Sequence, residues 1–281
     1  MKTSVIIATH NRSESLRRLV ASLAPELATG SREIIIAENG TPAPTQLTIE
    51  GVPLTHLHES RAGKCRIQNR SMAQASGEIL VFLDDDLVVA PGYLEAVEQF
   101  FDTHREFAAM KGRILPAEDP EKKVGPMAAY LDLPIADHGD EVVEVRGVLG
   151  ANMAFRADAI KQIGPFDERL GPGAGGHEEE TEMSQRLRRA GFRIGYAPKA
   201  LVYHEVDPSR ANRERFIRIA RERGRCRMLH EKHSALDVIV KNAIAIMRLR
   251  IAQLTRAGLP RIAREERRLA IARGMFDGLG G

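Results

Sequence analysis

The sequence predicts an α/β fold, in which a mostly parallel sheet flanked by helices is followed by a basic helical C-terminal region. The 281 residues include 43% hydrophobic and 28% charged residues, which are ordinary values for a globular protein and exclude disordered and fibrous classes. In the first half, short β-rich runs alternate with helical patterns at a spacing of about 30 residues, as expected for βαβ units. From Ser209 onward the pattern is helical and basic.

The first half supplies four expected strands and three expected helices. Strands are predicted at residues 4–9, 33–37 and 78–83, which are runs rich in aliphatic residues, and a weaker one at residues 55–58. Helices are predicted after Ser13, which can cap the first, over residues 64–76 before Gly77, and from Pro91. Ligands of such sheets bind at the carboxyl ends of the strands. Polar residues follow three of these strand ends, at 9–12, 38–39 and 84–86.

The second half is less regular. Strands are expected at residues 142–147, 152–156, 193–196 and 201–204, and helices at 158–163 and 179–190. A glycine-rich loop over residues 171–176 precedes the second helix. Mobile loops of this kind often close over substrates.

Charge is distributed unevenly along the chain. Residues 207–281 hold 18 Lys and Arg against 8 Asp and Glu, whereas residues 1–206 hold 23 against 30. We expect an anionic partner for this basic tail. The two cysteines, Cys65 and Cys226, suit a reducing compartment, and neither a signal peptide nor an apolar run of membrane-spanning length is apparent. The predicted location is cytoplasmic, with peripheral attachment at the inner face of the membrane as an option.

The acidic run Asp84-Asp85-Asp86 closes an apolar strand. Three adjacent carboxylates repel one another unless a cation neutralises them, and oxygen ligands favour Mg²⁺ or Mn²⁺. Alternation along an extended segment would place Asp84 and Asp86 on one face and Asp85 elsewhere. A divalent ion held there could grip a nucleotide diphosphate; the alternative is a solvated acidic turn.

Three other groups could take part in chemistry. Glu178-Glu179-Glu180 opens the helix after the glycine-rich loop, where acids are also favoured simply by the helix dipole. His204 ends a strand and is either a metal ligand or a structural histidine. Four cations near the 64–76 helix could hold phosphate or form an ordinary solvated face: Arg61, Lys64, Arg66 and Arg70.

Taken together and in order, these stretches resemble the family 2 glycosyltransferases, inverting enzymes with the GT-A fold and its Rossmann-like sheet. The matching segments are residues 4–12, 33–40, 61–64 with Asn69 and Arg70, 77–86, 150–156, 164–168 and 175–191, closing at His204. The resemblance covers residues 1–206. It implies a catalytic domain there, with a nucleotide-sugar-binding half at 1–115 and an acceptor-side half at 116–206, and leaves 207–281 as a basic helical extension.

The resemblance implies roles for individual residues. Thr9, Asn11 and Arg12 would approach the nucleoside, and Glu38 stands where the family usually has an Asp that contacts the base. Lys64, Asn69 and Arg70 would contact base and phosphate, and Asp84 and Asp85 would lie at the nucleotide sugar. Asp84, Asp86 and His204 would bind Mn²⁺ or Mg²⁺. Glu179-Glu180 matches a Glu-Asp pair whose second acid is the catalytic base.

The implied reaction moves a sugar from a nucleotide-diphosphate sugar, a UDP-sugar by preference, to a hydroxyl of a glycan or lipid-linked acceptor, as in polysaccharide biosynthesis. Glu at positions 38 and 180 is one methylene longer than the usual Asp, so base preference and the choice among Glu178, Glu179 and Glu180 stay open. The sequence allows two other functions. One is a non-catalytic nucleotide-sugar-binding protein, and the other is a haloacid dehalogenase-like phosphatase, whose signature residues 84–88 resemble.

The basic tail allows several partners. Eight arginines fall within residues 210–227, and an apolar pattern at helical spacing follows over residues 236–247. The tail is expected either to lie on an anionic membrane, to pack on the catalytic domain, or to form a homodimer. Nucleic acid is not expected, because the tail lacks interleaved aromatic residues.

Overall fold

The computed structural model describes residues 1–29, 31–40 and 54–280. The chain divides into two compact units. The first, called here the sheet unit, comprises Met1–Ala117, Pro134–Ala174 and Glu179–Glu205, and the second, the helical unit, comprises Glu118–Leu133, Gly175–Glu178 and Val206–Gly281. Most of the helical unit is the predicted tail. Two short segments from residues 116–206 also belong to it. The functional division of residues 1–206 into donor and acceptor halves stays a prediction.

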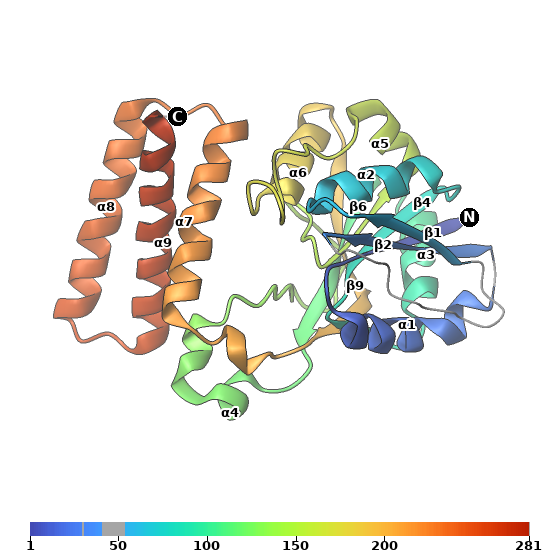
Figure 1. Ribbon diagram of the computed structural model, residues 1–281, viewed down its shortest axis with the longest axis horizontal. Helices are drawn as coiled ribbons and strands as arrows, with labels where there is room; N and C mark the ends of the chain where they lie inside the picture. Colours follow the sequence, from blue (N-terminus) through green and yellow to red (C-terminus); the bar gives the residue numbers. More distant parts are fainter. Residues whose placement is uncertain (30, 41–53, 281) are drawn as a thin grey trace. The chain divides into compact units, whose positions relative to one another are not determined.

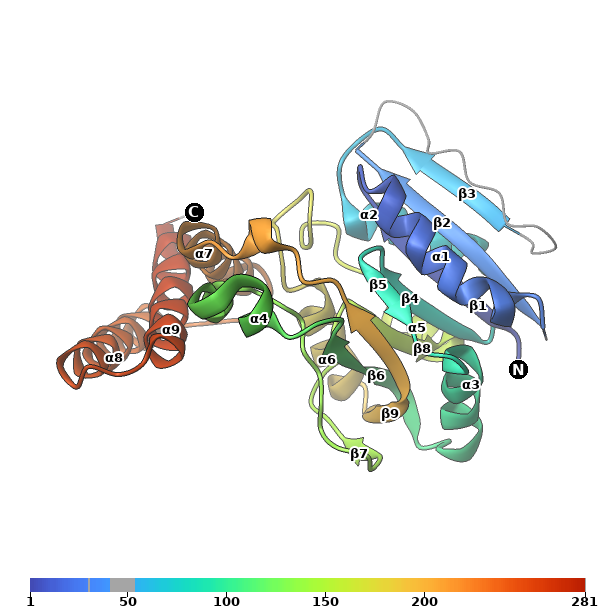
Figure 2. The ribbon, with the colours of Figure 1, turned by 90° about the horizontal axis from the view of Figure 1, so that it is seen from below.

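Among the described residues, nine strands form one sheet in the order β3-β2-β1-β4-β8-β6-β9-β5, with β7 paired to β9 (Figure 2). Their bounds are β1 Thr3–Thr9, β2 Arg32–Asn39, β3 Leu54–Glu59, β4 Ile79–Asp84, β5 Leu87–Val89, β6 Phe107–Pro116, β7 Val143–Glu144, β8 Asn152–Arg156 and β9 Arg193–His204. Strands β3, β2, β1 and β4 are parallel, while β8 is antiparallel to β4 and β6. The α/β class is confirmed, with antiparallel pairing concentrated in the second half.

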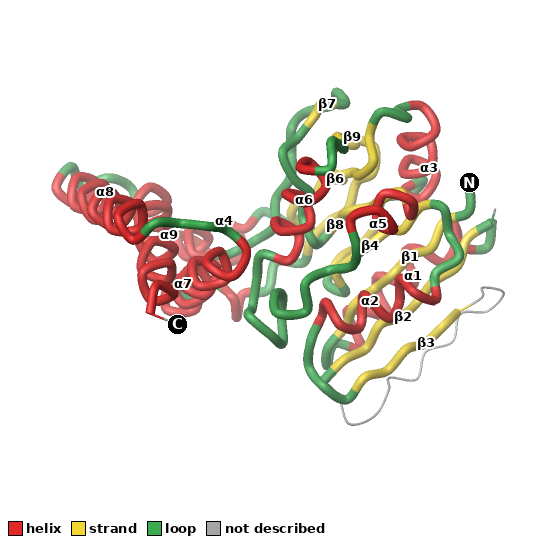
Figure 3. Tube along the Cα trace, turned by 90° about the horizontal axis from the view of Figure 1, so that it is seen from above, coloured by secondary structure: helices red, strands yellow, loops and turns green. Residues whose placement is uncertain are grey.

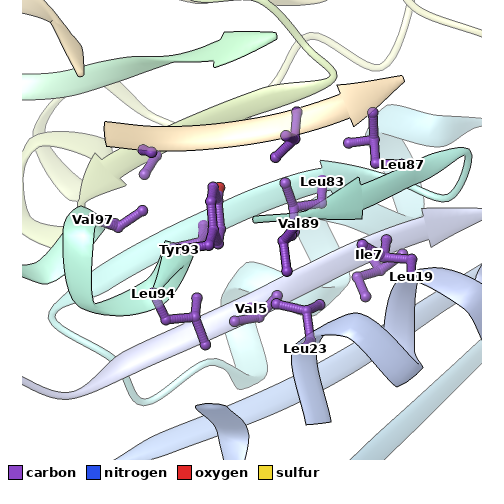
Figure 4. Close-up of a cluster of buried hydrophobic side chains, with 14 of the residues drawn as sticks. Val5, Ile7, Leu19, Leu23, Leu83, Leu87, Val89, Tyr93, Leu94 and Val97 are labelled. Atoms are coloured by element: carbon purple, nitrogen blue, oxygen red, sulfur yellow. The ribbon is translucent and has the colours of Figure 1, made fainter. Parts of the chain in front are cut away.

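Helices cover both faces of the sheet, because alternate strand residues point to opposite sides. Helices α1 (Ser13–Leu27) and α3 (Tyr93–Thr103) pack with Val5 and Ile7 on one face. Figure 4 shows this cluster, with Leu19 and Leu23 of α1 directed at the strands. Helices α2 (Lys64–Gln74), α5 (Ala157–Ile163) and α6 (Glu179–Arg189) pack with Ile6 and its neighbours on the other face (Figure 3).

Several element boundaries differ from the sequence prediction. The expected strand at 142–147 shrinks to β7, and the strands expected at 193–196 and 201–204 are one strand, β9, whose register shift against β6 accommodates Pro198. Helix α3 begins at Tyr93 after Gly92 rather than at Pro91, and the α1 cap position is Arg12, so Ser13 does not cap it. Strands β5 and β6 were not predicted, because Lys111-Gly112-Arg113 interrupts the apolar pattern of β6 and β5 is only three residues long.

The helical unit contains α4 (Pro120–Val124), η1 (Gly125–Tyr130), η2 (Pro208–Arg210), α7 (Arg213–His230), α8 (Ala235–Leu254), α9 (Leu259–Asp277) and η3 (Gly278–Gly280). Helices α7, α8 and α9 lie side by side (Figure 1). A Cβ on Gly224 would overlap the Ile271 carbonyl oxygen, and a Cβ on Gly274 would overlap that of Arg221. The two glycines therefore allow the α7 and α9 backbones to approach closely. Within the described residues, no helix has both the length and the apolarity needed to cross a bilayer.

Candidate active site

The acidic run lies where β4 ends. Asp84 is the last residue of β4, and Asp85 and Asp86 form a turn before β5. The alternation expected of an extended segment therefore stops at Asp84, and Asp85 does not point away from Asp86 as expected. Instead, Arg12 contacts both turn residues: its Nη1 donates to Asp85 Oδ1 at 3.0 Å and to Asp86 Oδ2 at 2.9 Å.

The first strand supplies the partners of Asp85. Because β1 is parallel to β4, Thr9 at the end of β1 lies beside the turn, and its Oγ1 donates to Asp85 Oδ2 at 2.7 Å. Burial raises the pKa of Asp85, against the opposing effects of the Thr9 hydrogen bond and the Arg12 charge. Thr9 and Arg12 thus compensate the burial of this carboxyl group.

His204 meets the same turn from the end of β9. Its Nε2 lies 3.2 Å from Asp86 Oδ1, and its Nδ1 lies 2.8 Å from the carbonyl oxygen of Glu205. Because a carbonyl only accepts, Nδ1 carries a proton, and Nε2 and the Asp86 oxygen share either a second proton or another cation. Burial alone would lower the pKa of His204, but the contact with Asp86 outweighs it and raises that pKa.

Lys64 connects the acidic run to helix α6. As the first residue of α2, it donates from Nζ to Asp84 Oδ1 at 2.6 Å, and the same nitrogen lies 3.8 Å from Glu179 Oε1. Burial would lower the pKa of Lys64, but the Asp84, Glu179 and Glu180 carboxyl groups raise it further than burial lowers it. A charged ammonium group therefore bridges the two sets of acids.

Glu179 and Glu180 open α6 with different surroundings. Glu179 is buried at 5% exposure, and Glu180 is half-buried. Burial and the neighbouring Glu179 carboxylate raise the pKa of Glu180 to about 8. Glu178 belongs to the helical unit, where its carboxylate accepts from Arg227 Nε at 3.2 Å. Of the three consecutive acids, the two on α6 are therefore the ones next to Lys64.

Three of the expected site residues are held by other partners, and a fourth, Asn11, is exposed. Asn69 hydrogen-bonds the backbone nitrogen and oxygen of Phe166, and Arg70 donates to the His58 carbonyl oxygen and to Glu59. Two more lie at the strand ends: Asn11 is exposed with a left-handed φ of 53°, and Glu38 is buried with Oε2 3.0 Å from His56 Nε2. The structure thus joins the site through Thr9, Arg12, Lys64, Asp84, Asp85, Asp86, Glu179 and His204.

Two asparagines join distant segments of the sheet unit. The sequence indicated Asn39 only as a polar residue after a strand end and suggested no role for Asn152. Asn39 donates to the Thr9 carbonyl oxygen and accepts from the Gly63 nitrogen, which ties β1, β2 and the start of α2 together. Asn152 is fully buried; its amide donates to the Arg113 and Ala200 carbonyl oxygens and accepts from the Tyr93 hydroxyl. Position alone signalled Asn39, since it follows a strand end, whereas the burial of Asn152 depends on strands that pair far along the chain.

The donor set can be compared with what a divalent cation needs. Over residues 1–29, 31–40 and 54–280, no three His, Cys, Asp or Glu side chains already converge as a metal site. The Asp86–His204 pair nevertheless has the chemistry of two ligands, because an oxygen and a ring nitrogen face each other and the other ring nitrogen is fixed by a carbonyl. Two protein ligands suit a Mg²⁺-type ion that also binds substrate phosphates.

Sequence comparison shows the family to which the chain belongs. The pattern of Glycosyl transferase family 2 matches residues 4–164. The "Pre-mycofactocin glycosyltransferase" of Mycobacterium tuberculosis is 29% identical over 217 residues, which cover 72% of this chain and 42% of that protein. The "Glucosyl-dolichyl phosphate glucuronosyltransferase" of Haloferax volcanii is 22% identical over 219 residues, covering 73% of this chain and 70% of the relative. This chain therefore spans under half of the mycobacterial protein.

Structural comparison supports the same assignment at the level of the fold. A mannosyltransferase from Pyrobaculum calidifontis, solved in complex with GDP-Man and Mn²⁺, superposes with a TM-score of 0.60 over 98% of this chain and 87% of its own, at 17% identity. The GT-A fold is confirmed. The family match over residues 4–164 does not agree with the haloacid dehalogenase-like alternative. The chain belongs to glycosyl transferase family 2.

Proposed function

We propose that this enzyme transfers a sugar, with inversion, from a nucleotide-diphosphate sugar to a hydroxyl group of a glycan or lipid-linked acceptor, in the presence of Mn²⁺ or Mg²⁺. The observation that carries the proposal is the position of Lys64, which contacts Asp84 on one side and Glu179 on the other. Lys64 thus lies between two groups: the acidic run 84–86 with His204, where we place the donor, and the acids that begin α6. We call the first group the donor end. Donor binding and proton removal are thus assigned to neighbouring residues.

The donor end suits a diphosphate. Arg12 and Lys64 supply positive charge around the acidic turn, and a guanidinium group matches phosphate oxygens geometrically. The Pyrobaculum mannosyltransferase, of the same fold, was solved with GDP-Man. We favour a UDP-sugar as the donor here, and Glu38 is the residue we assign to base preference. Thr9 and Asn11 are assigned to contacts with the nucleoside. Asn69 and Arg70 of α2 are assigned to contacts with the base and phosphate.

A divalent cation would be held by Asp86 and His204, with Asp84 joining if Lys64 releases it. Mn²⁺ in the Pyrobaculum complex supports this assignment. When bound, the ion supplies positive charge that stabilises the negative charge growing on the leaving diphosphate. Arg12, which touches Asp85 and Asp86, would orient both carboxylates toward the donor.

Glu180 is the residue we assign as general base. The acceptor hydroxyl gives its proton to the Glu180 carboxylate, its oxygen forms a bond to the anomeric carbon, and the bond from that carbon to the diphosphate breaks with the electron pair leaving on the diphosphate. A base with a pKa of about 8 suits proton removal near neutral pH. Glu179, fixed near Lys64, raises that pKa and is the rival for the same role.

The test compares Glu180→Gln with Glu179→Gln and with a control on the same helix, Glu182→Gln, whose carboxylate pairs with Arg186 rather than with the site. Nucleotide release with donor and acceptor is measured together with donor affinity. We expect Glu180→Gln to lower turnover by about 10²- to 10⁴-fold with donor affinity unchanged, and Glu182→Gln to be near wild type. Unchanged turnover in Glu180→Gln would contradict the assignment, and a loss confined to Glu179→Gln would move it to Glu179.

A further inference from the structure

Helix α8 turns its large apolar side chains outward. Six of them, called here the α8 stripe, are 40–82% exposed: Leu236, Val240, Ile244, Met247, Ile251 and Leu254. At 100° per residue they fall within an arc of about 80° on one side of the helix. The residues that α8 buries are smaller: Val238, Ala245 and Ala252. An ordinary packed helix buries its large apolar side chains and exposes its small or polar ones. The exposed stripe is therefore typical of a surface that contacts a partner.

Basic grooves flank this stripe on both sides. One groove is lined by Arg227, Lys241, Arg248 and Arg268, with Ile244 and Glu231. The other is lined by Arg213, Arg221, Arg250 and Arg273, with Ile246 and Glu266. Five of these eight cations form ion pairs: Arg213 with Glu266, Arg221 with Asp277, Arg227 with Glu178, Lys241 with Asp237 and Arg268 with Glu265. The charge excess nevertheless remains, because residues 207–281 hold 18 Lys and Arg against 8 Asp and Glu. An apolar stripe between rows of cations is complementary to an anionic lipid surface.

A second copy of the chain fits this surface less well. Two facing α8 helices would bring Lys241, Arg248 and Arg250 of each copy close to those of the other, and like charges at an interface are costly. The stripe also contains only Leu, Val, Ile and Met, without the aromatic anchors that dominate protein–protein interfaces. A helix of 20 residues is about 30 Å long, but α8 carries too many charges to cross a bilayer and suits a position along its surface.

We propose that α8 lies in the surface of an anionic membrane, with the stripe at the acyl-chain boundary and the basic grooves at the lipid phosphates. The inference uses only the helical unit and does not depend on the proposed reaction. It takes up one of the three arrangements expected for the tail, attachment to an anionic membrane.

The experiment is flotation of the full chain with two kinds of vesicle, phosphatidylcholine alone and phosphatidylcholine with about one third phosphatidylglycerol. We expect binding to the anionic vesicles that weakens with salt, and little binding to the zwitterionic ones. The double variant Met247→Glu/Ile251→Glu should bind at least about tenfold less, because it puts two charges into the stripe. The control Thr103→Glu/Gln162→Glu changes net charge equally at exposed positions of the sheet unit and should bind about as tightly as wild type.

Circular dichroism checks that both variants fold. We expect that they do, because all four positions are exposed. Failure of the wild-type chain to float with anionic vesicles at low salt would overturn the proposal, as would equal losses in the two double variants. A dimer in lipid-free buffer that Met247→Glu/Ile251→Glu dissociates would overturn it in favour of self-association. None of these readouts uses activity, so they leave the proposed function untouched.

Discussion

Lys64 Nζ lies 2.6 Å from Asp84 Oδ1, so the ammonium group at the start of α2 holds the carboxylate that ends β4. The same nitrogen is 3.8 Å from Glu179 Oε1, and the Glu179 side chain is almost completely buried. One cation therefore compensates two acids from distant parts of the chain. Its removal should affect folding as well as catalysis, because the two carboxylates would face each other without a counter-charge.

Lys64→Met tests this bridge. Leaving a buried carboxylate such as Glu179 without its partner typically costs about 3 kcal/mol or more, whereas Asp84 is partly exposed, so we expect the free energy of unfolding to fall by about 3 kcal/mol. Lys64→Arg retains the charge and should lose less. Urea unfolding at neutral pH measures both, with Lys161→Met, at an exposed pair with Asp158, as the control. A Lys64→Met protein as stable as that control would show that the bridge contributes nothing.

The raised pKa of Glu180 predicts a pH dependence of activity. If its carboxylate is the base, kcat/KM should rise about tenfold per pH unit below a midpoint near 8 and level off above it. Glu180→Gln should lack this limb. A wild-type profile that is flat between pH 6 and 9, at constant metal and donor, would exclude Glu180 as the titrating base.

The same shift has a consequence for stability. The pKa of Glu180 rises from an ordinary 4.5 to about 8 on folding, so between these values the folded chain holds a proton that the unfolded chain has lost. The contribution of Glu180 to stability is present below about 4.5 and is lost as pH rises toward 8. We therefore expect the free energy of unfolding of the wild type to fall relative to that of Glu180→Gln as the pH rises from about 4.5 to about 8. Thermal or urea unfolding at several pH values measures it, and a difference independent of pH would contradict the shift.

The crossing of α7 and α9 predicts a strong effect of one methyl group. Gly274→Ala would push Cβ into the Arg221 carbonyl oxygen, so the helices must separate, at a cost of about 3 kcal/mol. Gly258→Ala is the matched control, because a Cβ there meets only Pro260 at 3.9 Å. Thermal unfolding compares the two. Equal midpoints would mean that the close approach of the helices is not required.

The sequence predicted the parallel first half of the fold well because β1, β2 and β4 are apolar runs and helices with regular apolar spacing follow β1 and β3. It also identified the residues at the carboxyl ends of β1, β4 and β9, since polar groups after buried strands meet at one sheet edge. It could not predict that Asp85 and Asp86 turn together toward Arg12, or that Lys64 reaches Glu179, because these contacts depend on how distant segments pair. Strand β6 escaped for a related reason: its burial comes from pairing with β8 and β9 rather than from its own pattern.

Calorimetric titration of a nucleotide-sugar panel, UDP- and GDP-sugars included, tests the central claim most directly, with Mn²⁺ present or chelated and with wild type beside Asp86→Asn. We expect tight donor binding by wild type only with Mn²⁺, and at least about tenfold weaker binding by Asp86→Asn, because Asp86 and His204 face each other at 3.2 Å as a ligand pair. Donor affinity that is the same with and without Mn²⁺, or the same in Asp86→Asn, would contradict the account.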